Sequence, residues 1–145
     1  MSSVKIIDFG FGDHKKSNSS YDAHVGTLVY MAPEVAFEHT YSKSVDVWAI
    51  GIIMHYIITG KHPFYVKETD NTLSFKKKLQ AMSKMNKLEP LGSLSWVAKN
   101  LFQRLTTIQA HARYTCKDAN KHPWITRNKL DKIPESFGDK ISKFE

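Results

Sequence analysis

The sequence predicts a mainly α-helical domain with one short β-strand at its N-terminus. Residues 71–85 and 94–105 repeat apolar side chains at the three- and four-residue spacing of amphipathic helices. Residues 45–60 are apolar at nearly every position and are bounded by residues that start and stop helices. Residues 4–7 form a short, mostly apolar run, which is typical of a buried strand.

The first third of the chain is predicted to contain a strand, a loop and a short helix. The strand, residues 4–7, runs directly into Asp8-Phe9-Gly10. Residues 13–24 are polar and rich in Ser and Asn, so we expect an exposed loop. A short helix is expected to follow Pro33 and to continue through Phe37.

The apolar segment 45–60 is predicted to be the central helix. Ser44 or Asp46 would cap its start, and Gly60 would end it. A helix that is apolar all round is normally buried all round. Its many β-branched residues would also suit a strand, but its length and caps favour a helix.

The C-terminal part is predicted to form short helices and a tail. Thr115 and Asp118 have the spacing of a capping box, which would open a helix before His122-Pro123-Trp124. Trp48 and Trp124 are expected in the core. Residues 126–145 are polar, and we expect a loosely held tail.

Composition indicates a globular protein of 145 residues, with 41% apolar and 24% charged residues. Cys116 is the only cysteine, so no internal disulfide is possible, and a reducing compartment is favoured. We expect its side chain to be buried or half-buried. No signal peptide and no membrane span are expected, which favours a cytoplasmic location with the nucleus as the open alternative.

The net charge of +7 does not by itself indicate a nucleic-acid partner. The lysines are scattered, only three arginines occur, and the densest cluster, Lys76–Lys78, is interpreted as a solvated helix face. The seven histidines and Cys116 do not follow a metal-ligand spacing. We therefore expect neither nucleic-acid binding nor a zinc site.

Several short motifs occur in a fixed order along the chain. In that order they are Asp8-Phe9-Gly10, Gly26-Thr27, Ala32-Pro33-Glu34, Asp46-Val47-Trp48, Thr59-Gly60-Lys61-His62-Pro63-Phe64, Arg113-Tyr114-Thr115 and His122-Pro123-Trp124. The series resembles the C-terminal lobe of a eukaryotic protein kinase, over residues 4–125. The residues within these motifs are most similar to those of the calcium/calmodulin-dependent kinase group. The resemblance implies a partial kinase domain at 1–125, with an activation segment at 8–34, lobe helices at 44–125 and a tail at 126–145.

The resemblance implies transfer of the ATP γ-phosphate to Ser or Thr of a protein substrate, with ATP and Mg²⁺ as cofactors. Asp8 would be a Mg²⁺ ligand, because Mg²⁺ is held by carboxylate and phosphate oxygens. Phe9 would pack beneath it, and Gly10 would let the backbone change conformation. Standing alone, Asp8 would be read as an acid that ends a strand.

The resemblance also assigns roles within the activation segment. Thr27 matches a position that contacts the catalytic loop in Ser/Thr kinases. Phosphorylation of the polar middle would add charge that basic groups could capture. The candidate phosphosites are Ser17, Ser19, Ser20 and Tyr21. The alternative is that these are ordinary polar loop residues.

Three further residues are implied to be structural. Glu34 and Arg113 would form a buried ion pair that ties the activation segment to the last helices. Asp46 would hydrogen-bond to the backbone of the catalytic loop. None of these three would take part in the chemistry.

The nucleotide-binding motifs of the family do not occur in these 145 residues. There is no Gly-rich loop, no paired strand lysine and no H-R-D-x-x-x-x-N, so no catalytic residue is assigned. We expect the chain to be inactive alone. Helix 45–60 would also lack a neighbour, and exposing about 500 Å² of apolar surface would cost on the order of 12 kcal/mol. The chain is therefore expected to be marginally stable, or to need a partner that covers this apolar face.

Two function classes follow from these observations. The first is an enzyme: the C-terminal lobe of a Ser/Thr protein kinase. The second is a non-catalytic, kinase-like fragment that binds or regulates other proteins. Phosphoryl transfer by the chain alone, abolished by Asp8→Ala, would show that the missing motifs are dispensable.

Overall fold

The computed structural model describes residues 5–11, 28–38, 42–60, 62–63, 72–85 and 95–126. The predicted phosphosites, Thr27 and the tail beyond residue 126 lie outside these ranges. The described part is mainly α-helical, and it contains no strand. The predicted fold class is therefore confirmed in its helical character.

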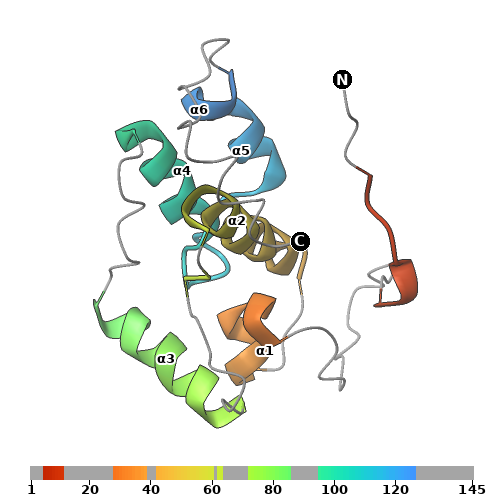
Figure 1. Cartoon of the computed structure of the whole chain (residues 1–145), viewed down its shortest axis with the longest axis vertical. Helices are drawn as coiled ribbons and strands as arrows, with labels where there is room; N and C mark the ends of the chain where they lie inside the picture. The colour runs from red at the N-terminus through yellow and green to blue at the C-terminus, as the bar shows by residue number, and fades with distance from the viewer. Residues whose placement is uncertain are drawn as a thin grey trace.

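The helices form two groups on either side of one central helix (Figure 1). The central helix is α2, Ser44–Thr59. On one side lie α1, Pro33–Glu38, and α3, Thr72–Met85; on the other lie α4, Trp96–Leu105, α5, Cys116–Lys121, and α6, Pro123–Thr126. Two 3-10 turns, Phe9–Phe11 and Leu28–Tyr30, complete the described elements.

The strand predicted at residues 4–7 is the main error of the sequence analysis. Val4 is not described, and residues 5–8 have no regular structure. The side chains of Ile6 and Ile7 are 81% and 80% exposed. A strand is stabilised by hydrogen bonds to a neighbouring strand, and the described residues offer none.

Helix α2 ends where the sequence predicts but begins differently. Gly60 has a φ of 67° and donates its backbone N–H to the Tyr56 carbonyl at 2.8 Å, which confirms the predicted stop. At the other end the cap position is Lys43, without a side-chain hydrogen bond. Ser44 and Asp46, the predicted caps, lie inside the first turn.

Helix α2 is buried on one face only. Val47, Trp48 and Ile52 are in the core, whereas Ile50, Ile53 and Ile57 are 49%, 46% and 50% exposed. These three residues are therefore not buried all round, and their exposure agrees with the expectation that helix 45–60 lacks a neighbour in these 145 residues. The sequence alone did not reveal which face has neighbours, because both faces are apolar.

Two hydrophobic clusters hold the helices together. The first lies between α1, α2 and α3 and contains Ala32, Val35, Ala36, Trp48, Ile52, Phe75 and Leu79. The second joins α2 to α4 through Val47, Leu101 and Leu105, and the partly buried Trp124 packs against it. Trp48 is fully buried, as predicted. Cys116 is exposed, so the expectation that it is buried or half-buried is wrong.

Local capping positions the helices of the second group. Ser95 caps α4 by accepting the Ala98 N–H at 3.3 Å. The predicted capping box at the start of α5 is present: Thr115 accepts the Asp118 N–H, and the Asp118 carboxylate accepts the Thr115 N–H at 2.9 Å. These hydrogen bonds lower the pKa of Asp118 below its ordinary value.

Candidate functional site

Asp8 stands in an exposed segment apart from the helices. Its φ of 61° lies in the left-handed region, and its Oδ1 accepts the Gly10 N–H at 3.4 Å. Phe9 is exposed and does not pack beneath it in a core. In Figure 1 this red segment is separated from the helical body. The structure thus does not bring Asp8 to α2.

The described residues do not fit a Mg²⁺–nucleotide site. Mg²⁺ needs near-octahedral oxygen coordination, and Asp8 contributes a single exposed carboxylate. Within the described ranges no group of three or more His, Cys, Asp or Glu side chains could hold a metal ion. Asp8 alone therefore cannot position the phosphates of ATP.

Glu34 and Arg113 form a buried, bidentate ion pair. Arg113 Nη1 donates to Glu34 Oε1 at 2.7 Å, and Nη2 donates to Glu34 Oε2 at 2.8 Å. The two residues are 79 positions apart in the sequence, and both are buried. Two parallel charge-assisted hydrogen bonds fix the orientation of both side chains as well as their separation.

Every N–H of the Arg113 guanidinium has an acceptor. Besides Glu34, Nε donates to the Thr107 carbonyl at 2.8 Å, Nη1 to the Ser44 carbonyl at 2.9 Å, and Nη2 to the Ile108 carbonyl at 3.1 Å. The guanidinium carbon also lies 5.1 Å from the centre of the Trp48 ring. A fully satisfied guanidinium compensates for the loss of water on burial.

This network joins three separate parts of the chain. Glu34 belongs to α1, Ser44 begins α2, and Arg113 lies in the loop between α4 and α5. The Ser44 hydroxyl adds a hydrogen bond to Glu34 Oε1 at 3.2 Å. The arrangement therefore locks the start of α1 and the start of α2 onto the loop that precedes α5.

Asp46 lies in the first turn of α2 with an exposed side chain. The sequence contains no H-R-D motif that could supply the catalytic-loop backbone expected beside it. Its role as an acceptor for that backbone stays a prediction. Ser17, Ser19, Ser20, Tyr21 and Thr27 lie outside the described residues, so their roles also stay predictions.

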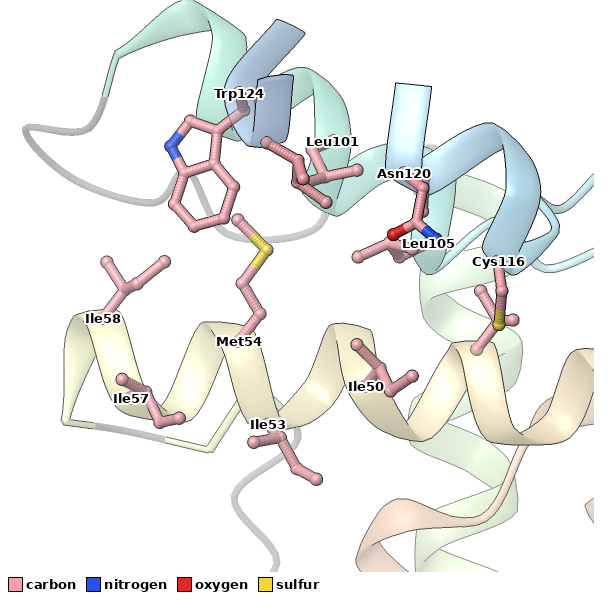
Figure 2. Close-up of a pocket in the computed structure, with 13 residues that line it drawn as sticks. Ile50, Ile53, Met54, Ile57, Ile58, Leu101, Leu105, Cys116, Asn120 and Trp124 are labelled. Atoms are coloured by element: carbon pink, nitrogen blue, oxygen red, sulfur yellow. The ribbon is translucent and has the colours of Figure 1, made fainter. Parts of the chain in front are cut away.

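An apolar groove beside α2 was not predicted from the sequence. It has a volume of about 390 Å³. Figure 2 shows Ile50, Met54, Ile57 and Ile58 along α2, with residues of α4, α5 and α6 opposite them. The lining consists of Val47, Ile50, Ile53, Met54, Ile57, Ile58, Leu101, Leu105, Cys116, Ala119, Asn120, Trp124 and Ile125. The excess of apolar residues round α2 was the sequence feature that could have indicated it.

The buried His122, which fastens α6 to α4, was also not predicted from the sequence. His122 Nε2 lies 3.1 Å from Asn100 Oδ1, and His122 Nδ1 accepts the Trp124 N–H at 3.2 Å. Since Nδ1 is an acceptor, the ring is neutral and Nε2 carries the proton that bonds Asn100. Burial, with a smaller contribution from the charge of Arg104, lowers the pKa of His122.

Comparisons with known proteins identify the family. The model of the protein kinase domain matches residues 1–125. The chain is 35% identical to a calcium/calmodulin-dependent protein kinase type 1 of Macrobrachium nipponense, over 98% of this chain and 41% of that protein. It is 34% identical to the human serine/threonine-protein kinase H1, over 86% of this chain and 29% of that protein. It is 33% identical to the serine/threonine-protein kinase 33 of Bos taurus, over 86% of this chain and 26% of that protein.

The chain spans less than half the length of the curated relatives it matches. The matched region nevertheless covers residues 1–125, which include Asp8, Glu34, Asp46 and Arg113. The family match and the ordered motifs agree, and two of these relatives are named as serine/threonine-protein kinases. The chain therefore belongs to the protein kinase family, and it resembles Ser/Thr kinases of the calcium/calmodulin-dependent kind.

Proposed function

We propose that this chain is the C-terminal lobe of a Ser/Thr protein kinase, which transfers the γ-phosphate of ATP to Ser or Thr of a protein substrate. In this proposal the lobe anchors the activation segment and supports the substrate, and a separate part of the domain binds ATP and Mg²⁺. The Glu34–Arg113 network carries the proposal, because it fastens the end of the predicted activation segment to the helical body.

The 145 residues are proposed to be inactive by themselves. Phosphoryl transfer depends on positioning the phosphates and neutralising their charge. The sequence supplies Asp8 but neither a Gly-rich loop nor the acid and amide of the catalytic loop. Since Asp8 is exposed and apart from the helices, an ATP-binding part is needed to place it.

A chimera tests this proposal. The segment from the Gly-rich loop to the catalytic loop of the M. nipponense relative would be fused before Val4, and transfer of labelled phosphate to Ser, Thr and Tyr peptides would be measured. We expect transfer to Ser and Thr peptides by the chimera and none by the 145-residue chain. Asp8→Ala should abolish the transfer, whereas Lys77→Ala, on the exposed side of α3, should leave it unchanged.

Two results would contradict parts of this proposal. Transfer by the 145-residue chain alone that Asp8→Ala abolishes would contradict the proposed inactivity of these residues. A chimera that folds cooperatively and binds ATP but transfers no phosphate would contradict the enzyme proposal. The Tyr peptide serves as the specificity control, because transfer to Tyr would contradict the Ser/Thr assignment.

The second candidate is a non-catalytic, kinase-like module that binds another protein. The half-exposed Ile50, Ile53 and Ile57 beside the apolar groove favour it. A large exposed apolar patch commonly marks an interaction site. A cytoplasmic location belongs to both proposals, and its support is the single cysteine. A folded but inactive chimera would favour this second candidate.

A further inference from the structure

His122 contacts two helices at once through its two ring nitrogens. Nδ1 accepts the N–H of Trp124, the second residue of α6, at 3.2 Å. Nε2 lies 3.1 Å from Asn100 Oδ1 on α4. His122 also ends α5, because its backbone N–H donates to the Ala119 carbonyl at 3.0 Å. One side chain therefore determines how α6 is attached to the rest of the lobe.

All the backbone N–H groups of α6 are bonded to His122. The first helical position is Pro123, which has no N–H. The Trp124 N–H donates to the His122 ring, and the N–H groups of Ile125 and Thr126 donate to the His122 carbonyl at 2.9 and 3.0 Å. The ring nitrogen thus acts as the N-cap of α6, in the place that a side-chain oxygen normally takes.

A cap made by Nδ1 requires a neutral ring. A neutral imidazole has one donor and one acceptor nitrogen, whereas a protonated ring has two donors. Since Nε2 carries the proton that bonds Asn100, an added proton would occupy Nδ1, towards which the Trp124 N–H points. Two N–H groups would then face each other, and α6 would lose its cap.

The nearest charge and the nearest ring do not favour a protonated His122. Burial, and then the charge of Arg104 on α4, lower the pKa of His122. The centre of the Tyr114 ring lies 6.2 Å from the centre of the His122 ring. The Arg104 guanidinium already lies over the Tyr114 ring, 5.6 Å from its centre. A proton on His122 would thus add a second cation beside the same aromatic ring.

The remaining charged groups of the packed elements are mostly basic. Helix α6 has no charged residue, and Arg113 in the preceding loop is paired with Glu34. Asp118 on α5 accepts hydrogen bonds from the Thr115 N–H and hydroxyl and is attracted by Lys121. The other charged residues of α4 and α5 are Lys99 and Lys117.

Little else in the described residues fastens α6. The helix has four residues, far fewer than an isolated helix needs, and none of them is buried. Trp124 packs, partly buried, against the cluster that contains Leu101 and Leu105 (Figure 2). The cluster between α1, α2 and α3 contains no described residue of α4, α5 or α6. Since α6 is the last described element, its release requires no earlier element to move.

We propose that His122 is a pH-dependent latch: the neutral ring holds α6 on α4, and protonation of the ring releases α6 while α1 to α4 stay packed. The pKa of a released, exposed ring is 6.5, and that of the docked ring is lower, so acidification favours release. Docking is fully supported above pH 6.5 and is lost as the pH falls towards the pKa of the docked ring. The latch does not depend on phosphoryl transfer, so it stands apart from both functions proposed above.

NMR of isotope-labelled tryptophan tests the latch in the 145-residue chain. Its three tryptophans report on different places: Trp48 is buried in the core, Trp96 is exposed at the start of α4, and Trp124 lies in α6. Trp96→Phe and Trp124→Phe assign the indole signals, which are then followed between about pH 8 and pH 5. We expect the Trp124 signal to move to the position of an exposed indole, with a midpoint below pH 6.5, while the Trp48 signal stays in place. The ring C–H signal of His122 should titrate with the same midpoint.

His122→Asn separates the cap from the titration. Asn is a good N-cap residue without a titratable group, so its side chain can accept the Trp124 N–H at every pH. We expect Trp124 to stay docked down to about pH 5 in this variant. His111→Asn is the matched control, because it makes the same change at an exposed histidine of the preceding loop and should leave the titration unchanged. Far-UV circular dichroism at about pH 8 checks that both variants fold.

Three results would overturn the proposal. If the Trp48 and Trp124 signals moved together, acid would unfold the whole lobe rather than release α6. If the Trp124 signal did not follow the titration of the His122 ring, another group would control α6. If His122→Asn released Trp124 at the same midpoint as the unmodified chain, the cap would not be the titrating contact. The first two results come from the unmodified chain, so they decide the question even if His122→Asn does not fold.

Discussion

At the residue scale, the buried guanidinium of Arg113 depends on hydrogen-bond acceptors from several parts of the chain. Its five N–H groups need five acceptors, and only one of these comes from within five residues. Only the family resemblance indicated Glu34 as the partner of Arg113. The carbonyl acceptors of Ser44, Thr107 and Ile108 could not be foreseen, because backbone groups carry no signature in the sequence.

We predict that Arg113→Leu lowers the free energy of unfolding by about 3–5 kcal/mol, because Glu34 is then buried as an unpaired charge. Urea denaturation measures this loss. The double variant Glu34→Leu/Arg113→Leu should recover part of it, since no charge then remains buried. A loss below about 1 kcal/mol for the single variant would show that the pair behaves as an exposed one.

His122 should make stability dependent on pH. Its pKa is 6.5 when exposed and lower in the fold, so the unfolded chain takes up a proton first on acidification. The contribution of neutral His122 is therefore full above pH 6.5 and is lost as the pH falls towards the lower folded pKa. Protonation also removes the acceptor for the Trp124 N–H.

Thermal melts between about pH 5 and pH 8 check this prediction. The melting temperature should decline below pH 6.5, and His122→Gln should flatten the decline. Asp118 stays ionised over this interval, since its pKa is lowered from 3.8. A decline of equal size in His122→Gln would assign the pH dependence to another group.

At the scale of elements, α2 and α4 approach closely at one glycine. A methyl group at Gly51 would lie 2.5 Å from Thr106 Cγ2 and 3.1 Å from Leu105 Cβ. We predict that Gly51→Ala costs about 1–3 kcal/mol through overpacking, despite the higher helix propensity of alanine. Ile53→Ala, on the exposed face of α2, should lower the free energy of unfolding by less. Equal losses of this free energy for the two variants in urea denaturation would contradict the close approach of α2 and α4 at Gly51.

The capping box at α5 should have a measurable effect of its own. Thr115→Ala removes the acceptor for the Asp118 N–H, so we expect a loss of about 1 kcal/mol in the free energy of unfolding. Thr107→Ala is a suitable control, because its exposed hydroxyl donates only to the carbonyls of Gln103 and Arg104. A larger loss in the control would contradict the assignment.

At the scale of the whole molecule, the sequence predicts what is local and misses what depends on neighbours. The Gly60 stop and the Thr115–Asp118 box were foreseen, because both depend on a few adjacent residues. The strand at 4–7 was wrong, because a strand exists only with a second strand beside it. An exposed apolar face on α2 was expected from the missing neighbour, but which side it would be was not, because periodicity does not show which neighbours are present.

The exposed isoleucines should govern solution behaviour. We predict that Ile50→Gln with Ile53→Gln and Ile57→Gln lowers the fluorescence of bound anilinonaphthalene sulfonate and reduces self-association in sedimentation velocity. The melting temperature should change little, because these side chains are already half-exposed. A strong fall in melting temperature would show that this face is packed in solution.

No helix within the described ranges is long and apolar enough to cross a membrane. The two faces of α2 have different neighbours: Trp48 and Ile52 pack with residues of α1 and α3, whereas Val47 packs with α4, whose Leu101 and Leu105 also line the groove.

The Glu34–Arg113 pair has a consequence for synthesis on the ribosome. Because 79 residues separate the partners, at about 5–20 residues per second Arg113 is added roughly 4–16 seconds after Glu34. During this interval the Glu34 carboxylate must remain hydrated, and α1 cannot reach its final position. Glu34, which is synthesised early, is thus paired only when Arg113 is added. In a nascent chain released before Arg113, the Glu34 carboxylate would lack its ion-pair partner.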